Sequence, residues 1–137
     1  MTIGKTRDFY RNFNNICDCS YCRNYIKEVR KTYPDLAEYL NKIGVDIEKP
    51  FETMPGEPDG GYIEYFGIQY IIIDDKNNFK KEKCGEVRVD LAKSFPDPGI
   101  DGEYYVIEIY LIKLKWRKNT KNDKNLQRIY RSKRRIC

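Results

Sequence analysis

Three cysteines lie within six positions near the start of the chain: Cys17, Cys19 and Cys22. They belong to residues 17–25 (CDCSYCRNY), and no other spacing in the 137 residues indicates chemistry so directly. Histidine is absent, which excludes histidine-based triads, imidazole acid–base catalysis and zinc sites that mix cysteine with histidine. Three roles are open to these thiols: packing, metal binding and redox exchange.

Packing is the first role. Cysteine is among the residue types most often buried, and it then behaves as a small apolar side chain. Cys22 falls on the apolar face of a predicted helix, together with Tyr25 and Val29. The sequence favours packing over the other two roles, with local backbone turns at Cys17 and Cys19.

Metal binding is the second role. Thiolates two and three positions apart can wrap one Zn²⁺, which takes four ligands in a tetrahedral shell. Cys17, Cys19 and Cys22 would supply three of them, and the fourth would be Cys84, Cys137 or a carboxylate. The candidate metal ligands are therefore Cys17, Cys19, Cys22 and Cys84. The motif lacks a second pair of cysteines, so zinc is a weaker hypothesis than packing.

Redox exchange is the third role. Cys19-Ser-Tyr-Cys22 at the start of a helix has the C-x-x-C form of thioredoxin-like proteins, in which the helix N-terminus stabilises the first thiolate. That fold requires a buried apolar strand directly before the motif, but residues 12–15 are polar. A dithiol oxidoreductase that uses Cys19 and Cys22 is the enzyme hypothesis, and it ranks below zinc.

Other chemistry-bearing side chains form no catalytic set. Glu64 and Glu108 lie among apolar neighbours, and a desolvated pair of them would serve acid–base chemistry. Such residues more often face solvent or pair with a cross-strand arginine such as Arg88. The glycines at 60–61 and 99 lie among acids, so no phosphate-cradling loop is expected.

The charge is unevenly distributed. Residues 113–137 hold eleven Lys and Arg against one Asp, whereas the rest of the chain is acidic, and the overall net charge is +5. Such a tail predicts salt-sensitive, sequence-independent binding of nucleic acid, with a tyrosine available for stacking. We favour the alternative over nucleic-acid binding: the tail is either a solvated arm or an arm that pairs with the acidic rest of the chain. The candidate nucleic-acid contacts are Lys118, Lys121, Arg128, Tyr130, Arg131, Lys133, Arg134 and Arg135.

Length and composition bound the class of protein. A chain of 137 residues with 40% hydrophobic residues suits one domain with one core. The longest aliphatic run, residues 71–73, is far too short for a membrane span, so no membrane partner is expected. Five cysteines without an export signal favour free thiols, a metal site or a redox site in the cytoplasm.

Two helices are predicted in the first half. In the first, Ser20 caps the N-terminus and the apolar positions continue to Val29. In the second, Pro34 occupies the first turn and Gly44 closes the C-terminus. Residues 4–15 are interpreted as a short edge strand or an irregular approach.

The second half is predicted to be an antiparallel meander. A brief strand is expected over 51–54, and a strand covered on both faces over 62–73, with Gly67 at a bulge. A charged loop over 76–83 precedes an alternating strand over 86–91, with Val87, Val89 and Leu91 facing inward. The last long strand is expected over 104–116.

The cysteine segment also resembles a known family. Residues 19–25 (CSYCRNY), followed by 33–36 (YPDL) and 44–52 (GVDIEKPFE), look like a family of small, uncharacterised bacterial proteins common in Gram-positive anaerobes. The resemblance covers residues 9–73 and implies a grouping without a mechanism. The basic extension after Trp116 is longer than is usual in that family, so a function of the tail would belong to this member.

The sequence therefore predicts one α+β domain over residues 1–116 and a basic extension over 117–137. Two packed helices would cover a sheet of three to four antiparallel strands. We expect a small non-enzymatic interaction or accessory domain with a structural cysteine cluster, which could bind a zinc ion. Nucleic-acid binding through the tail and dithiol redox activity are the alternatives, and the partner would be a protein or a nucleic acid.

Overall fold

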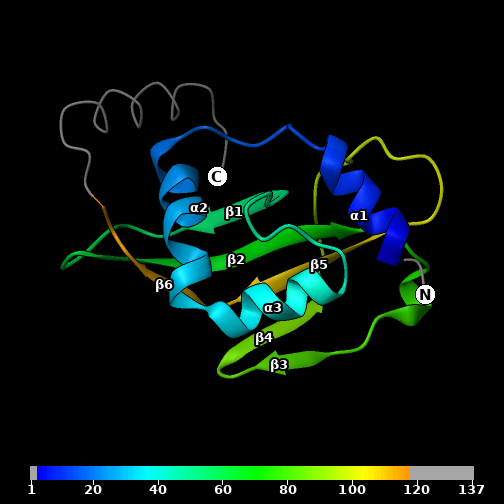
Figure 1. The fold of residues 1–137 in the computed structure, drawn as a ribbon. Coiled ribbons are helices and arrows are strands. Elements are labelled where there is room, and N and C mark those ends of the chain that lie inside the picture. The colour runs from blue at the N-terminus through cyan, green and yellow to red at the C-terminus, as the bar shows by residue number, and fades with distance from the viewer. Residues whose placement is uncertain (1–2, 118–137) are drawn as a thin grey trace.

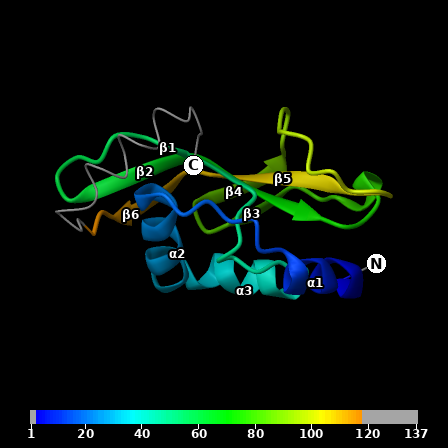
Figure 2. The ribbon, with the colours of Figure 1, turned by 90° about the horizontal axis from the view of Figure 1, so that it is seen from above.

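The computed structural model describes residues 3–117 and confirms an α+β fold (Figure 1). Most of the predicted basic extension lies outside this range. Three helices pack on one face of an antiparallel sheet of six strands (Figure 2). The elements are α1 (Ile3–Asn12), α2 (Ser20–Thr32), α3 (Pro34–Lys42), β1 (Glu52–Pro55), β2 (Tyr62–Ile72), the 3-10 helix η1 (Lys76–Asn78), β3 (Glu82–Cys84), β4 (Val87–Leu91), β5 (Tyr105–Tyr110) and β6 (Ile112–Lys115). Within residues 3–117, no helix combines the length and the apolar character needed to cross a membrane.

The order of the strands corrects the predicted meander. The sheet runs β1-β2-β5-β4-β3, and β6 pairs with β2, so β5 lies between β2 and β4. The paired parts of β2 and β5 are buried or half-buried on both faces, whereas β4 alternates between buried and more exposed residues. Burial on both faces favours adjacent central positions for β2 and β5, and β4 takes a place nearer the edge.

The helices confirm two predictions and overturn a third. The helices predicted around Val29 and after Pro34 are α2 and α3. Residues 3–12 form α1, so the strand or irregular approach expected over 4–15 is wrong up to Asn12, and only residues 13–15 are irregular. Thr6 and Tyr10, four residues apart, provide the buried face of this helix.

Strand β2 is covered on both faces only in its second half. Tyr62, Glu64 and Phe66 face solvent, whereas every residue from Gly67 to Ile72 is buried. The predicted bulge is confirmed: the register against β1 shifts between Thr53 and Pro55, opposite Gly67. The additional cover comes from the segment after β4, because the Gln69 side chain donates to the Ser94 carbonyl oxygen at 2.9 Å.

Three details of the later strands also differ from expectation. Leu91, predicted to face inward, is 38% exposed, while Val87 and Val89 are buried as expected. The long strand expected over 104–116 divides at Leu111 into β5 and β6, which pair with different halves of β2. The charged loop predicted over 76–83 contains η1 and the start of β3.

Side chains from the helices, and from Tyr33 between α2 and α3, satisfy backbone groups at open strand edges. The Tyr10 hydroxyl donates to the Ile71 carbonyl at 2.8 Å and accepts from the Ile71 N–H at 2.9 Å. On β6, the Tyr33 hydroxyl makes the same pair of bonds with the Lys113 backbone at 3.2 and 2.9 Å. Asn24 of α2 bonds the backbone next to the same edge. These bonds fix the helices to the sheet, since backbone groups at an open strand edge have no partner in the sheet.

Candidate functional site

The cysteine cluster, which we define as Cys17, Cys19 and Cys22, lies at the N-terminus of α2. Cys19 is the N-cap residue, and its sulfur accepts the Cys22 backbone N–H at 3.4 Å. The predicted cap was Ser20, which instead begins the helix and is buried. The Ser20 hydroxyl has no hydrogen-bond partner within the described part of the chain.

The three sulfur atoms lie within 4.8 Å of one another. Cys19 and Cys22 are 6% and 2% exposed, and Cys17 is half-buried. The Cys22 sulfur is 3.3 Å from the Thr53 hydroxyl, so the start of α2 is fastened to β1. A cluster of this geometry could hold a metal ion. In this structure Cys17 is disulfide-bonded, whereas Cys19 and Cys22 are free thiols.

Cys19 and Cys22 differ in acidity. The Cys22 thiol donates a hydrogen bond to the Cys19 sulfur and lowers the pKa of Cys19; backbone N–H groups at the helix start act in the same direction, and burial opposes them. The same bond holds the proton of Cys22, and together with burial it raises the pKa of Cys22. A thiolate in this cluster therefore forms first on Cys19.

Cys84, the predicted fourth metal ligand, does not join the cluster. It lies on β3 at the edge of the sheet opposite β1, and β3 packs against α3. Burial raises the pKa of the Cys84 thiol, and the charges of Glu82 and Asp35 add to that effect. The carboxylate fourth ligand and Cys137 remain as predictions, and Cys137 lies outside the described residues.

The two predicted carboxylates are not brought together. Glu64 lies opposite Lys113 of β6 and faces solvent. Glu108 lies between Gln69 and Asp90 in the register and accepts a hydrogen bond from the Gln69 amide at 3.0 Å. Arg88, the suggested cross-strand partner, lies opposite Tyr110. Glu64 and Glu108, the two predicted carboxylates, therefore do not form a pair suited to acid–base work.

The candidate nucleic-acid contacts of the tail, Lys118, Lys121, Arg128, Tyr130, Arg131, Lys133, Arg134 and Arg135, all lie outside the described residues. Nucleic-acid binding therefore stays a prediction. Trp116, just before this stretch, is half-buried and packs on Tyr21 with ring centroids 5.6 Å apart. Its indole belongs to the packing of α2 on the sheet.

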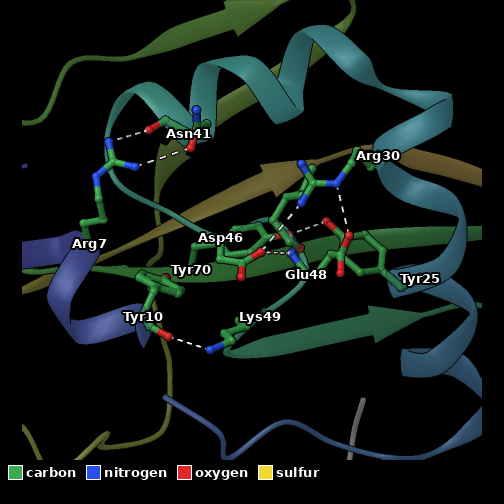
Figure 3. Close-up of polar contacts among 10 residues, drawn as sticks. Arg7, Tyr10, Tyr25, Arg30, Asn41, Asp46, Glu48, Lys49 and Tyr70 are labelled. Atoms are coloured by element: carbon green, nitrogen blue, oxygen red, sulfur yellow. Dashed lines mark hydrogen bonds and ion pairs between the residues drawn. The ribbon is translucent and has the colours of Figure 1, made fainter. Parts of the chain in front are cut away.

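A second site was not predicted. A cavity of about 450 Å³ lies between α1, the end of α3 and the loop that follows it (Figure 3). We call it the basic cavity, and its polar lining comes from Arg7, Arg11, Arg30, Asn41, Asp46 and Lys49. In the sequence, this site could have been suggested by Arg7 and Arg11, which lie four positions apart. That spacing places both side chains on one face only if residues 3–12 are recognised as a helix.

Comparisons with protein-family models, with curated proteins and with solved structures find no match to this chain. The resemblance drawn from the cysteine segment therefore stays a prediction.

Proposed function

We propose that this chain is a small, non-enzymatic accessory domain whose cysteine cluster binds one Zn²⁺ as a structural ion. The observation that carries the proposal is the approach of three sulfurs within 4.8 Å, two of them buried. Buried thiolates with this spacing match the ligand chemistry of structural zinc sites. The ion would join the loop before α2 to the start of the helix.

The redox state of Cys17 determines when the metal binds. Because Cys17 is disulfide-bonded in this structure, the three-thiolate site belongs to the reduced protein. Three thiolates leave one position of a tetrahedral shell for a further ligand. The Zn²⁺ ion and its three thiolates together carry a net negative charge. The half-buried Arg23, one residue after Cys22, would offset part of that charge.

Cobalt titration of the reduced full-length chain tests this proposal. We expect one equivalent of Co²⁺ to produce the intense thiolate-to-cobalt absorption of a sulfur-rich tetrahedral site, and Zn²⁺ to displace it. Cys19→Ser should lose the absorption, whereas the matched control Cys84→Ser should retain it because Cys84 lies outside the cluster. No thiolate absorption in the reduced wild type, or equal loss in both variants, would contradict the proposal.

The unequal acidity of Cys19 and Cys22 favours a second candidate, a dithiol oxidoreductase. The Cys19 thiolate would attack a disulfide of a substrate, forming a mixed disulfide and releasing one substrate thiol. Cys22 would then attack the Cys19 sulfur, closing a Cys19–Cys22 disulfide and releasing the second thiol, so that two electrons pass to the substrate.

The pH dependence of Cys19 alkylation tests this second candidate. We expect an apparent pKa below that of an ordinary thiol, which is about 8.5. Cys22→Ala should raise it, because the variant removes the hydrogen bond that stabilises the Cys19 thiolate. An unchanged profile in Cys22→Ala, or no reduction of a small disulfide by the wild type, would exclude this mechanism.

A further inference from the structure

We propose that the face of the sheet turned away from the helices binds single-stranded nucleic acid where β2 pairs with β6. This site is separate from the cysteine cluster, and neither proposal depends on the other. We define the outer face by five residues: Tyr62, Glu64 and Phe66 of β2, and Lys113 and Lys115 of β6. It offers rings on which bases stack and cations that contact phosphates, the two elements that proteins use to bind single strands.

The register of β2 and β6 puts these side chains on one side of the sheet. Tyr62 lies opposite Lys115, and Glu64 lies opposite Lys113, and directly paired residues share a face. Phe66 continues the alternation of β2 on the same side. The residues between them on both strands are buried on the other side, where α1, α2 and α3 lie (Figure 2). The outer face is therefore one continuous surface.

The two aromatic side chains of the outer face are open to solvent. Tyr62 and Phe66 are 45% and 57% exposed, the highest values among the large apolar residues of the described part of the chain. The Phe66 ring lies against Gly56, where an added Cβ would be 2.8 Å from it. The segment after β4, held by the Gln69–Ser94 hydrogen bond, covers the second half of β2 instead. Rings that are supported from below and open above are platforms for stacking bases.

Charge divides the outer face into two rows. The β2 row carries one acid, Glu64, and the loop before β2 carries two more, Glu57 and Asp59. The β6 row carries two exposed lysines, Lys113 and Lys115, and neither forms an ion pair within residues 3–117. Phosphates are therefore expected along β6, where they meet only cations, and bases over β2.

Lys113 connects the two rows. Its ammonium lies 5.2 Å from the centroid of the Tyr62 ring, a cation–π contact that orders both side chains. Nearly half of Tyr62 remains exposed beside this contact, so ring surface is left for a base. A base stacked there would bring its own phosphate to the lysine row, because adjacent strands lie only about 4.8 Å apart.

The chain itself adds positive charge at the end of the lysine row. Residues 118–137 carry eight Lys and Arg against one Asp, and they begin three positions after β6 ends at Lys115. Their covalent attachment keeps this charge close to the outer face. A polyanion is the partner that this charge selects, and the open rings select a single strand, because the bases of a duplex already stack on one another.

Glu64 determines which base is preferred. It lies between Tyr62 and Phe66 on the same strand and forms no ion pair among the described residues. A carboxylate accepts a hydrogen bond from the exocyclic amine of cytosine, whereas thymine has a carbonyl oxygen at the same position and is repelled. We therefore expect a strand of cytosines to bind more tightly than a strand of thymines.

Fluorescence anisotropy with the full-length chain and labelled oligo(dC), oligo(dT) and a duplex of the same length tests the proposal. We expect oligo(dC) to bind most tightly and the duplex most weakly. Phe66→Ala should weaken oligo(dC) binding by about tenfold, the loss of one base–aromatic stack, without changing its salt dependence. Lys115→Gln should lower the slope of log affinity against log salt by about 0.7, because one fewer phosphate is neutralised.

Each variant has a matched control that leaves the outer face intact. Phe95→Ala removes an exposed phenylalanine from the segment after β4, and Lys5→Gln removes an exposed cation from α1 on the helix side. Both should bind oligo(dC) as the wild type does, and circular dichroism should show that all four variants fold.

Three results would overturn the proposal: no binding of either strand by the wild type at low salt, wild-type affinity in Phe66→Ala, or a duplex bound as tightly as a single strand. The second would assign binding to the basic segment alone, and the third would assign it to charge alone. Equal affinity for oligo(dC) and oligo(dT) would overturn the role given to Glu64.

Discussion

The cysteine cluster and the basic cavity are built in opposite ways. The cluster takes its three sulfurs from six consecutive positions, and one helix start brings them together. The cavity collects its polar side chains from α1, α2, α3 and the loop up to Lys49, with β2 behind them (Figure 3). A local site of the first kind depends on one turn of backbone, whereas the second depends on the docking of separate elements. The two should therefore respond differently to changes in packing.

Alkaline pH should have the largest effect on the stability of the fold. Burial raises the pKa values of Tyr10, Tyr25, Tyr65 and Tyr70, and three of these tyrosines lie at or beneath the basic cavity (Figure 3). Their folded-state pKa values are above the unfolded value of about 10, so their contribution to stability is complete below pH 10 and is lost as pH rises.

The free energy of unfolding should then fall above pH 10 by about 1.4 kcal/mol per pH unit for each tyrosine, or about 5 kcal/mol per unit for all four. Urea denaturation at several pH values, with tyrosinate absorbance recorded in parallel, measures this slope. A flat profile between about pH 10 and pH 11.5 would mean that these hydroxyls ionise freely in the folded protein.

Tyr10→Phe removes the contact that fixes α1 to β2. The Ile71 N–H and carbonyl are buried and would lose their shared partner, which should cost about 3 kcal/mol of unfolding free energy. Urea denaturation measures the loss, and Tyr62→Phe is the control, since Tyr62 is exposed and should change stability by less than about 0.5 kcal/mol. Cobalt binding at the reduced cluster should survive in Tyr10→Phe, and its loss would contradict the separation of the two sites.

Gly44→Ala tests the turn that positions α1. The backbone there has positive φ, which costs an alanine about 1 kcal/mol, and the new methyl group would meet the Ile3 carbonyl. We expect a total cost of about 2 kcal/mol. Gly102→Ala shares the positive φ but has nothing within 4 Å, so it should cost only about 1 kcal/mol. Equal costs in thermal unfolding would show that the contact with α1 is unimportant.

Arg30→Gln should have the smallest effect on stability. Its ion pairs with Glu48 and Asp46 are about half exposed, and solvent-exposed pairs contribute less than about 1 kcal/mol. The small loss should shrink further at high salt, because exposed charges are screened. Denaturation at low and high salt checks this, with Lys42→Gln, which breaks the exposed pair with Glu38, as the comparison. A loss above 2 kcal/mol would mean that Arg30 supports the loop by packing.

Several elements were predictable because their signals are local. Pro34 and Gly44 marked the two ends of α3, and the alternation of Val87 and Val89 identified β4. Helix α1 was missed because Thr6 and Tyr10, its buried residues, are not strongly apolar. Their burial is stabilised by hydrogen bonds to Ile71 of β2 and to Ile73 just after it, which a hydrophobic pattern does not reveal. The assignment of the cap to Ser20 failed because sulfur also accepts a backbone N–H.

The sequence by itself determined the thiol cluster, the absence of histidine chemistry, the α+β class and the antiparallel character of the sheet. These properties follow from residue types and from periodicities of a few positions. Only the tertiary structure decided that β5 lies between β2 and β4, that Cys84 lies apart from the other cysteines, and that the basic cavity exists. Each of those depends on contacts between residues far apart in the chain, whose pairing is selected by burial and backbone hydrogen bonding over the whole fold.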